Sequence, residues 1–170
     1  GLTSAAVLEY DRQHAGYRSV LELWFDGLSP GDGQTYTDAA YNIFLNDRDP
    51  FLAELLSGAG FLGLISPHPG LASRLAERLH IREVENHVIP GETRLQAQIG
   101  EQRRERHFPE RFEQLLASLS VPYRGACFLV AGGLLGKLYC ARIRELGGIA
   151  LDIGALADGW MGYNTRGHGF

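Results

Sequence analysis

Cysteine, methionine and long apolar runs are scarce in this 170-residue chain. Two cysteines, Cys127 and Cys140, are too few for a disulfide scaffold or a zinc site, so we expect a reducing, cytoplasmic environment. No stretch reaches the ~18 consecutive apolar residues that a membrane-spanning helix needs, and the N-terminus shows no charged segment followed by an apolar one. We therefore expect neither a transmembrane segment nor an export signal.

Charge of one sign is also scarce, because 16 Lys and Arg residues face 20 Asp and Glu residues and leave a net charge of -4. Nucleic-acid backbones are held by clustered Lys and Arg, so general nucleic-acid binding is disfavoured. The chain is 45% hydrophobic and has the length of one ordinary domain. We expect a single domain over residues 1–170, with a mainly helical lead-in over residues 1–58 and a strand-helix core over residues 60–162.

The lead-in is expected to contain two helices. Apolar residues recur at helical intervals from Ser4 to Trp24. Asp49 followed by Pro50 is a good helix start, because the carboxylate can accept a free N–H and proline suits the first helical position. That second helix should end at Gly58.

Three continuous apolar runs, residues 60–66, 126–131 and 148–153, predict buried strands, and residues 83–90 predict a weaker one. Continuous hydrophobicity means that both faces of a strand are covered, as in a parallel sheet between helices. We therefore expect an α/β fold, a Rossmann-like, mostly parallel sheet of about four strands flanked by helices. Residues 91–106 are polar and expected to form a loop.

Helices are predicted between these strands. One carries the apolar stripe Leu71, Leu75 and Leu79, and another starts at Pro109. The helix before the last strand should face inward with Leu135, Leu138, Tyr139, Ile143 and Leu146.

The densest candidate site is the run AGGLLGK, residues 131–137, between a strand and a helix. Glycines let the backbone approach a ligand closely, and the N–H groups of a helix start attract an anion. Its candidate ligand-binding residues are Gly132, Gly133, Gly136 and Lys137. Asp152 ends the next strand, where a ribose-binding acid is expected in a dinucleotide fingerprint. The alternative is a tight turn with close helix packing, in which Lys137 extends to water.

Two nucleotide classes fit this run less well. Only 17 residues follow Ile153, which leaves too little chain for the second half of an NAD fold. Ala131 and Leu138 occupy positions where a nucleoside-triphosphate loop needs Gly and Ser or Thr.

Two carboxylates lie at or past the end of the last strand, which is where open α/β sheets place their ligands. Asp152 and Asp158 could hold Mg²⁺ or Mn²⁺ against a diphosphate, and Asp158 could act as a general base. The alternative is that Asp152 orders the turn at Gly154 and Asp158 is solvated.

Other candidate residues lie in turns and in the tail. Glu92 could hydrogen-bond sugar or ribose hydroxyls, and His68 follows the first strand in a proline-rich turn where a structural role is common. Trp160, Tyr163 and Arg166 could offer a stacking face and a cationic fork, or pack on the sheet. The basic cluster of residues 103–107 either meets phosphates or is solvated.

The C-terminal run FLVAGGLLGKLYCARIRELGGIALDIGALADGWMGYNTRG resembles bacterial glycosyltransferases of the GT-D fold. The segments GLISPHPGLASRLAERL, VIPGE and HFPERFEQLL share that resemblance, which is strongest from Phe128 to Arg166. It implies an enzyme of glycan or glycoconjugate assembly that binds a nucleotide sugar, most often a UDP-sugar, with a divalent metal. On this sequence the resemblance points to the glycine turn and to Asp152 and Gly154 after the last strand as binding residues. The Asp-x-Glu metal motif of that family is not in this chain, and residues 155–160 stand in its place.

Three functions follow from these observations. The first is a sugar-nucleotide-dependent glycosyltransferase acting on a glycan or protein acceptor, with Glu92 and Asp158 as candidate catalytic bases. The second is a non-catalytic ligand-binding or scaffolding module of a larger assembly. The third is another Rossmann-like enzyme, such as a methyltransferase, with Asp152 on a ribose.

Overall fold

A computed structural model describes residues 51–92, 95–96, 98 and 106–165. The chain divides into two compact units, Gly1–Thr37 and Asp38–Phe170, and all described residues belong to the second. The helix predicted from Ser4 to Trp24 and the cap predicted at Asp49 lie outside the described residues. The prediction of one domain for the whole chain stays a prediction.

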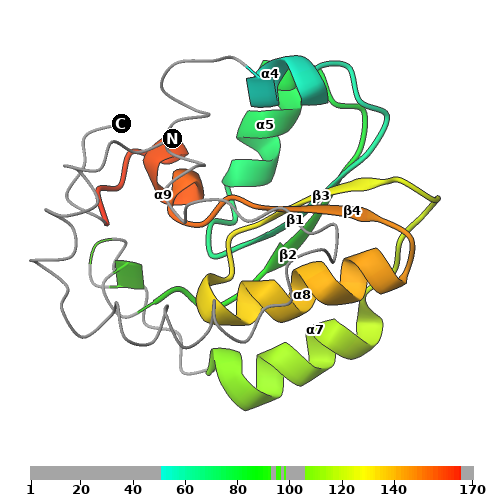
Figure 1. Cartoon of the computed structure of the whole chain (residues 1–170). Coiled ribbons are helices and arrows are strands. Elements are labelled where there is room, and N and C mark those ends of the chain that lie inside the picture. The colour runs from blue at the N-terminus through cyan, green and yellow to red at the C-terminus, as the bar shows by residue number, and fades with distance from the viewer. Residues whose placement is uncertain (1–50, 93–94, 97, 99–105, 166–170) are drawn as a thin grey trace, which may run out of the picture. The chain divides into compact units, whose positions relative to one another are not determined.

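The second unit is built around a sheet of four parallel strands, which confirms the predicted α/β class (Figure 1). The strands are β1 (Leu62–Ser66), β2 (Val84–Val88), β3 (Cys127–Val130) and β4 (Ile149–Asp152). Their order across the sheet is β2-β1-β3-β4.

Side chains of β1 pack into two core clusters, one on each face of the sheet. Leu62 and Leu64 pack in the first cluster and Ile65 in the second, and every residue of β1 is buried. This is the burial that a continuous apolar run predicts for an inner parallel strand. β2 lies at the sheet edge and its residues are half-buried, which explains its weaker apolar signal.

The first cluster is covered by three helices: α4 (Phe51–Leu56), α5 (Leu71–Leu79) and α9 (Leu156–Trp160). The predicted apolar stripe of α5 is confirmed, because Leu71, Leu75 and Leu79 are all buried. After α4 the chain turns at Gly58, whose φ of 71° lies in the left-handed region that favours glycine. The predicted helix end there is confirmed.

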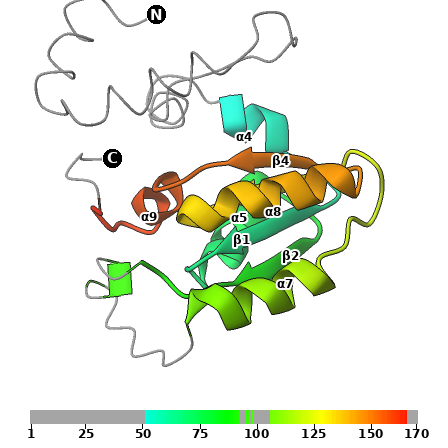
Figure 2. The same cartoon turned by 60° about the horizontal axis from the view of Figure 1, so that its bottom comes forward.

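The second cluster is covered by α7 (Phe112–Ser118) and α8 (Gly133–Glu145), which lie side by side (Figure 2). The segment η1 (His107–Arg111) leads into α7 and is kinked at Phe108, whose backbone is extended, with φ of -119° and ψ of 137°. The buried residues of α8 are Gly136, Tyr139 and Ile143. Leu138, predicted to face inward, is 51% exposed because the buried face of α8 is centred on Tyr139.

The order of the strands creates a switch point between β1 and β3. From β1 the chain runs through α5 to the neighbouring strand on one side, and from β3 it runs through α8 to the neighbouring strand on the other. The loops after these two strands therefore diverge. In open α/β sheets the ligand binds in the crevice that such diverging loops leave at the carboxyl ends of the strands.

One segment differs from its prediction, and the helix of a second segment had not been predicted. In the expected loop of residues 91–106, Leu95, Gln96 and Gln98 are helical, and Leu95 is buried against Gly91. The C-terminal stretch begins with α9, whose Gly159 gives a weak helix signal. In both places packing decides the local structure.

Candidate functional site

A pocket of about 220 Å³ opens at the carboxyl ends of the strands. Segments that follow all four strands contribute to it, so it lies at the switch point between β1 and β3. Its lining comprises Pro67, residues 89–92, Leu95, His107, residues 131–133, Gly154, Ala155, Asp158 and Thr165. The predicted site residues among these are Glu92, Gly132, Gly133, Gly154 and Asp158.

The glycine turn brings the start of α8 onto this pocket. Gly132 is the N-cap residue and makes no side-chain cap, and Gly133 has a φ of 58° that favours glycine. The first N–H groups of a helix have no acceptor within the helix, and here they begin at the pocket wall. A Cβ on Gly133 would lie 2.9 Å from Glu92 Oε1, so the carboxylate of Glu92 sits against the helix start. A negative charge is favourable there.

Gly136, the third glycine of the run, serves packing. A Cβ at this position would lie 3.4 Å from Val130 Cγ1, so glycine allows α8 to lie close to β3. Gly136 is buried and is not among the pocket-lining residues. This is the helix-to-strand role that the third glycine has in dinucleotide-binding turns.

Lys137 and Asp152 form an ion pair with each other. The Lys137 side chain is 68% exposed, and the second oxygen of Asp152, Oδ1, accepts the N–H of Gly154 at 3.1 Å. Neither side chain lines the pocket. Asp152 thus orders the turn at Gly154, which does line the pocket.

His68 and Asp158 form a second pair beneath the pocket. His68 is 2% exposed, and its Nε2 lies 2.8 Å from Asp158 Oδ1. Thr165 donates its hydroxyl to Asp158 Oδ2 at 2.6 Å. Asp158 lines the pocket and His68 stands behind it, so the histidine orients the carboxylate.

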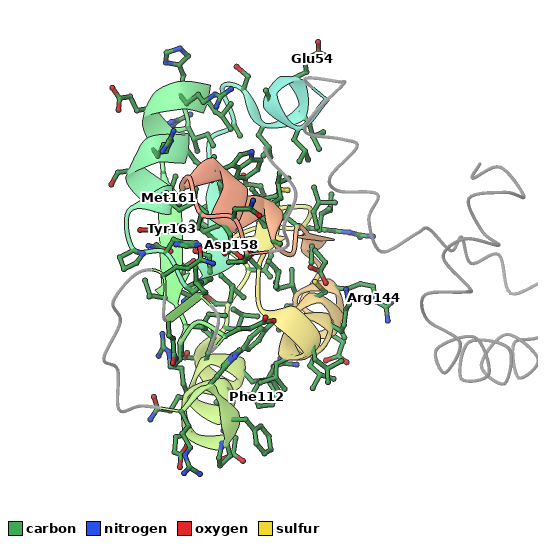
Figure 3. The ribbon with its side chains drawn as sticks, turned by 90° about the vertical axis from the view of Figure 1, so that its left-hand side faces the viewer. Glu54, Phe112, Arg144, Asp158, Met161 and Tyr163 are labelled. Carbon is green, nitrogen blue, oxygen red and sulfur yellow. The ribbon has the colours of Figure 1, made fainter. Side chains whose placement is uncertain are left out.

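Tyr163 ties the C-terminal segment to the same pair. Its ring stacks on His68 with centroids 5.5 Å apart and planes 7° apart. Figure 3 shows Tyr163 close to Asp158 of α9. Gln98 also donates its side-chain amide to the Asn164 carbonyl at 3.2 Å. These contacts hold the segment that brings Thr165 to the pocket wall.

Of the predicted aromatic and cationic cover of the site, Trp160 and Tyr163 lie among the described residues. Trp160 is partly buried against the first core cluster and does not line the pocket. Arg166 lies outside the described residues, as do Arg103 and Arg104 of the basic cluster.

His107 is a pocket residue that the sequence analysis grouped with the basic cluster of residues 103–107, for which phosphate contact and solvation were both open. Its Nε2 lies 3.0 Å from the hydroxyl of Tyr139, and the two rings stack with centroids 5.9 Å apart. Burial, together with the nearby Arg111, lowers the pKa of His107, while burial raises the pKa of Tyr139 to about 12. The available signal was Tyr139 itself, because a tyrosine on the inner face of a helix needs a partner for its hydroxyl.

Among the described residues, the two carboxylates predicted to hold a divalent cation already have other partners. The Asp152 oxygens are engaged by Lys137 and Gly154, and the Asp158 oxygens by His68 and Thr165. Within the part of the chain that the structure describes, no three His, Cys, Asp or Glu side chains gather closely enough to hold a metal ion. Burial raises the pKa of the Cys140 thiol to about 11, and also raises the pKa of Cys127, so both thiols are protonated at neutral pH.

Comparison with protein-family models, characterised proteins and solved structures finds no significant match to this chain. Among the described residues, no helix combines the length and the apolar character that crossing a membrane requires.

Proposed function

We propose that this chain is a sugar-nucleotide-dependent glycosyltransferase of the GT-D type, acting in bacterial glycan or glycoconjugate assembly with a UDP-sugar as donor. The observation that carries the proposal is the switch-point pocket, in which a glycine turn, a helix start and two carboxylates come together. Open α/β sheets bind ligands at this place, and the resemblance of the C-terminal run supplies the class of ligand.

The diphosphate belongs at the glycine turn in this proposal. Backbone N–H groups at Gly132 and Gly133 and the start of α8 favour a negative charge. Glu92 occupies this position in the free protein, and its side chain is exposed. Diphosphate binding then displaces the Glu92 carboxylate, which becomes available for a sugar hydroxyl.

Asp158 is the first candidate for the catalytic base and Glu92 the second. In the transfer step, the acceptor hydroxyl oxygen forms a bond to the anomeric carbon of the sugar, and the bond from that carbon to the diphosphate oxygen breaks. The hydroxyl proton moves to the carboxylate and the nucleoside diphosphate leaves. Each Asp158 oxygen already accepts one hydrogen bond and retains a second lone pair for the proton.

No metal takes part in the transfer step described above, although the family resemblance implies one. The developing charge on the leaving diphosphate is stabilised by backbone N–H groups at the helix start instead. Mn²⁺ dependence is therefore an outcome of the experiment.

The test is a thermal-shift and calorimetric screen of the full chain with UDP, GDP and their glucose conjugates, with and without Mn²⁺. S-adenosylmethionine and NAD serve as controls for other Rossmann-like enzymes. We expect stabilisation by UDP-glucose and release of UDP from it, both reduced in Asp158→Asn. Stabilisation by S-adenosylmethionine alone would instead support a methyltransferase.

A ligand-binding module without catalysis is the second candidate. It is favoured by the hydrogen bonds that already engage both oxygens of Asp158 and by the lack of the Asp-x-Glu motif. Such a module should bind UDP-glucose, leave its hydrolysis at background, and retain a stable protein partner in a pull-down. Turnover of UDP-glucose that Asp158→Asn abolishes would exclude it.

A further inference from the structure

His107 occupies a fixed place in the pocket wall although it comes from the crossover between β2 and β3. Arg111, in the same turn η1, donates its Nε–H to the Val88 carbonyl at 3.1 Å and so anchors the turn to the end of β2. The stack on Tyr139 holds the ring from the other side. The imidazole is therefore held by two elements.

Tyr139 also connects His107 to the glycine turn. A Cβ on Gly132 would lie 3.4 Å from Tyr139 Cδ2, so the tyrosine ring packs beneath that turn. Tyr139 is fully buried, and its ring lies 5.3 Å from that of Phe112. Its hydroxyl thus places His107 at a defined position relative to the start of α8.

The contact with Tyr139 uses Nε2 and leaves Nδ1 as the ring nitrogen for a ligand. In the neutral ring, a Tyr139 hydroxyl that donates to Nε2 leaves the hydrogen on Nδ1. In the imidazolium both nitrogens carry hydrogen, and the hydroxyl accepts instead. With the neutral tautomer in which Tyr139 is the donor, Nδ1 carries hydrogen in both protonation states, which suits a phosphate oxygen.

We propose that His107 is a ligand-binding residue of the pocket, donating its Nδ1–H to a phosphate oxygen of a nucleotide diphosphate held at the Gly132–Gly133 turn. Tyr139 is its positioning residue. This inference rests on the proposed function and names a phosphate contact within it.

The protonation of His107 should make the affinity for the phosphate ligand depend on pH. Arg111 on η1 and Tyr139 on α8 adjoin the imidazole, and Glu92 and Asp158 are the other titratable groups that line the pocket. Burial and Arg111 keep the ring neutral near pH 7 in the free protein, because they lower its pKa. A bound phosphate favours the imidazolium, so binding takes up a proton and tightens as the pH falls.

The experiment is calorimetric titration of the full chain with UDP-glucose between pH 6 and pH 8, a range in which its diphosphate diester does not titrate. We expect the wild type to bind about threefold to tenfold more tightly at the lower pH, since a shift of one pKa unit corresponds to about tenfold in affinity. His107→Gln should bind more weakly and lose this dependence. His87→Gln is the matched control, because His87 is another half-buried histidine with a lowered pKa that does not line the pocket.

The positioning role of Tyr139 is tested in Tyr139→Phe by the ¹⁵N signals of the His107 ring. Loss of the hydroxyl should change the tautomer at neutral pH and weaken UDP-glucose binding, while the fold, monitored by circular dichroism, is kept. His107→Asn is the second variant in case His107→Gln does not fold. If the tautomer of His107 and the affinity for UDP-glucose are both unchanged in Tyr139→Phe, Tyr139 does not position His107.

The remaining outcomes separate the two proposals. If UDP-glucose binds to His107→Gln with wild-type affinity and pH dependence, the His107 contact is wrong and the proposed function stands. If UDP-glucose does not bind but pyrophosphate shifts the ring signals of His107, the phosphate contact stands and the proposed function fails. If neither probe binds, both proposals fail.

Discussion

His68 Nε2 lies 2.8 Å from Asp158 Oδ1, although 90 residues separate the two along the chain. His68 follows β1 and Asp158 lies in α9, which follows β4, so their contact joins the segments after these two strands. Because the histidine is buried and the carboxylate side chain is 14% exposed, the pair contributes to both stability and the geometry of the site.

We predict that His68→Leu lowers the free energy of unfolding by about 1–3 kcal/mol, because it removes a donor from a largely buried carboxylate. The ring stack with Tyr163 is lost as well. Urea unfolding followed by circular dichroism measures the change. Arg142→Ala is the control, since it removes an exposed ion pair with Glu145 at 3.3 Å and should cost less than about 1 kcal/mol. Equal losses in the two variants would contradict a structural role for the His68–Asp158 pair.

The sheet was predictable because its evidence is local. Continuous apolar runs marked β1, β3 and β4, and glycines marked the turn before α8. The order of the strands has no such signal, and it decides which loops meet. The sequence therefore named Glu92, Gly133 and Asp158 separately, without showing that they line one pocket.

The same limit explains how Lys137 and Asp152 were interpreted. Each fits a ligand-binding role when read along the chain, but 15 residues of helix and strand bring them against each other. The place of His107 in the pocket could not be predicted for a related reason, because its contact with Tyr139 joins residues that are 32 positions apart. Side-chain pairs between elements depend on packing that hydrophobic periodicity does not encode.

For the Lys137–Asp152 pair we predict unequal costs. Lys137→Met should lower the free energy of unfolding by less than about 1 kcal/mol, because the lysine is mostly exposed. Asp152→Ala should cost more, since the Gly154 N–H also loses its acceptor. Asp152→Asn keeps an oxygen for that N–H and should fall between the two. In UDP-glucose titrations, Lys137→Met should leave the affinity nearly unchanged. A large loss of affinity would show that Lys137 is a binding residue after all.

Gly133 and Gly58 offer a matched pair of substitutions. Both have positive φ, 58° and 71°, so alanine at either position should cost about 1–2 kcal/mol of stability. A Cβ at Gly58 meets nothing within 4 Å, whereas one at Gly133 meets the carboxylate of Glu92 at the pocket wall. We expect similar losses of stability but weaker UDP-glucose binding in Gly133→Ala alone. Equal affinity in the two variants would place the diphosphate elsewhere.

The stability of the protein should fall on mild acidification because of two histidines. Burial is the main cause that lowers the pKa values of His87 and His107 below 6.5, Arg111 adds to both shifts, and Glu85 opposes the shift at His87. Histidines of the unfolded chain titrate near 6.5. Below that pH the unfolded chain binds more protons than the folded chain, so the free energy of unfolding decreases as the pH falls toward the lowered pKa values.

Urea unfolding at pH 7.5 and pH 5.5 tests whether the free energy of unfolding falls on acidification, because most carboxylates stay ionised over that range. The wild type should lose stability between the two conditions, and His87→Gln and His107→Gln should each lose less, since each removes one group that must stay neutral in the folded state. His80→Asn is the control: His80 is exposed and has a φ of 54°, a conformation that asparagine tolerates. A rise in stability on acidification would mean that protonation of these histidines favours the folded state. The conclusion that burial keeps His107 neutral at the pocket wall would then be wrong.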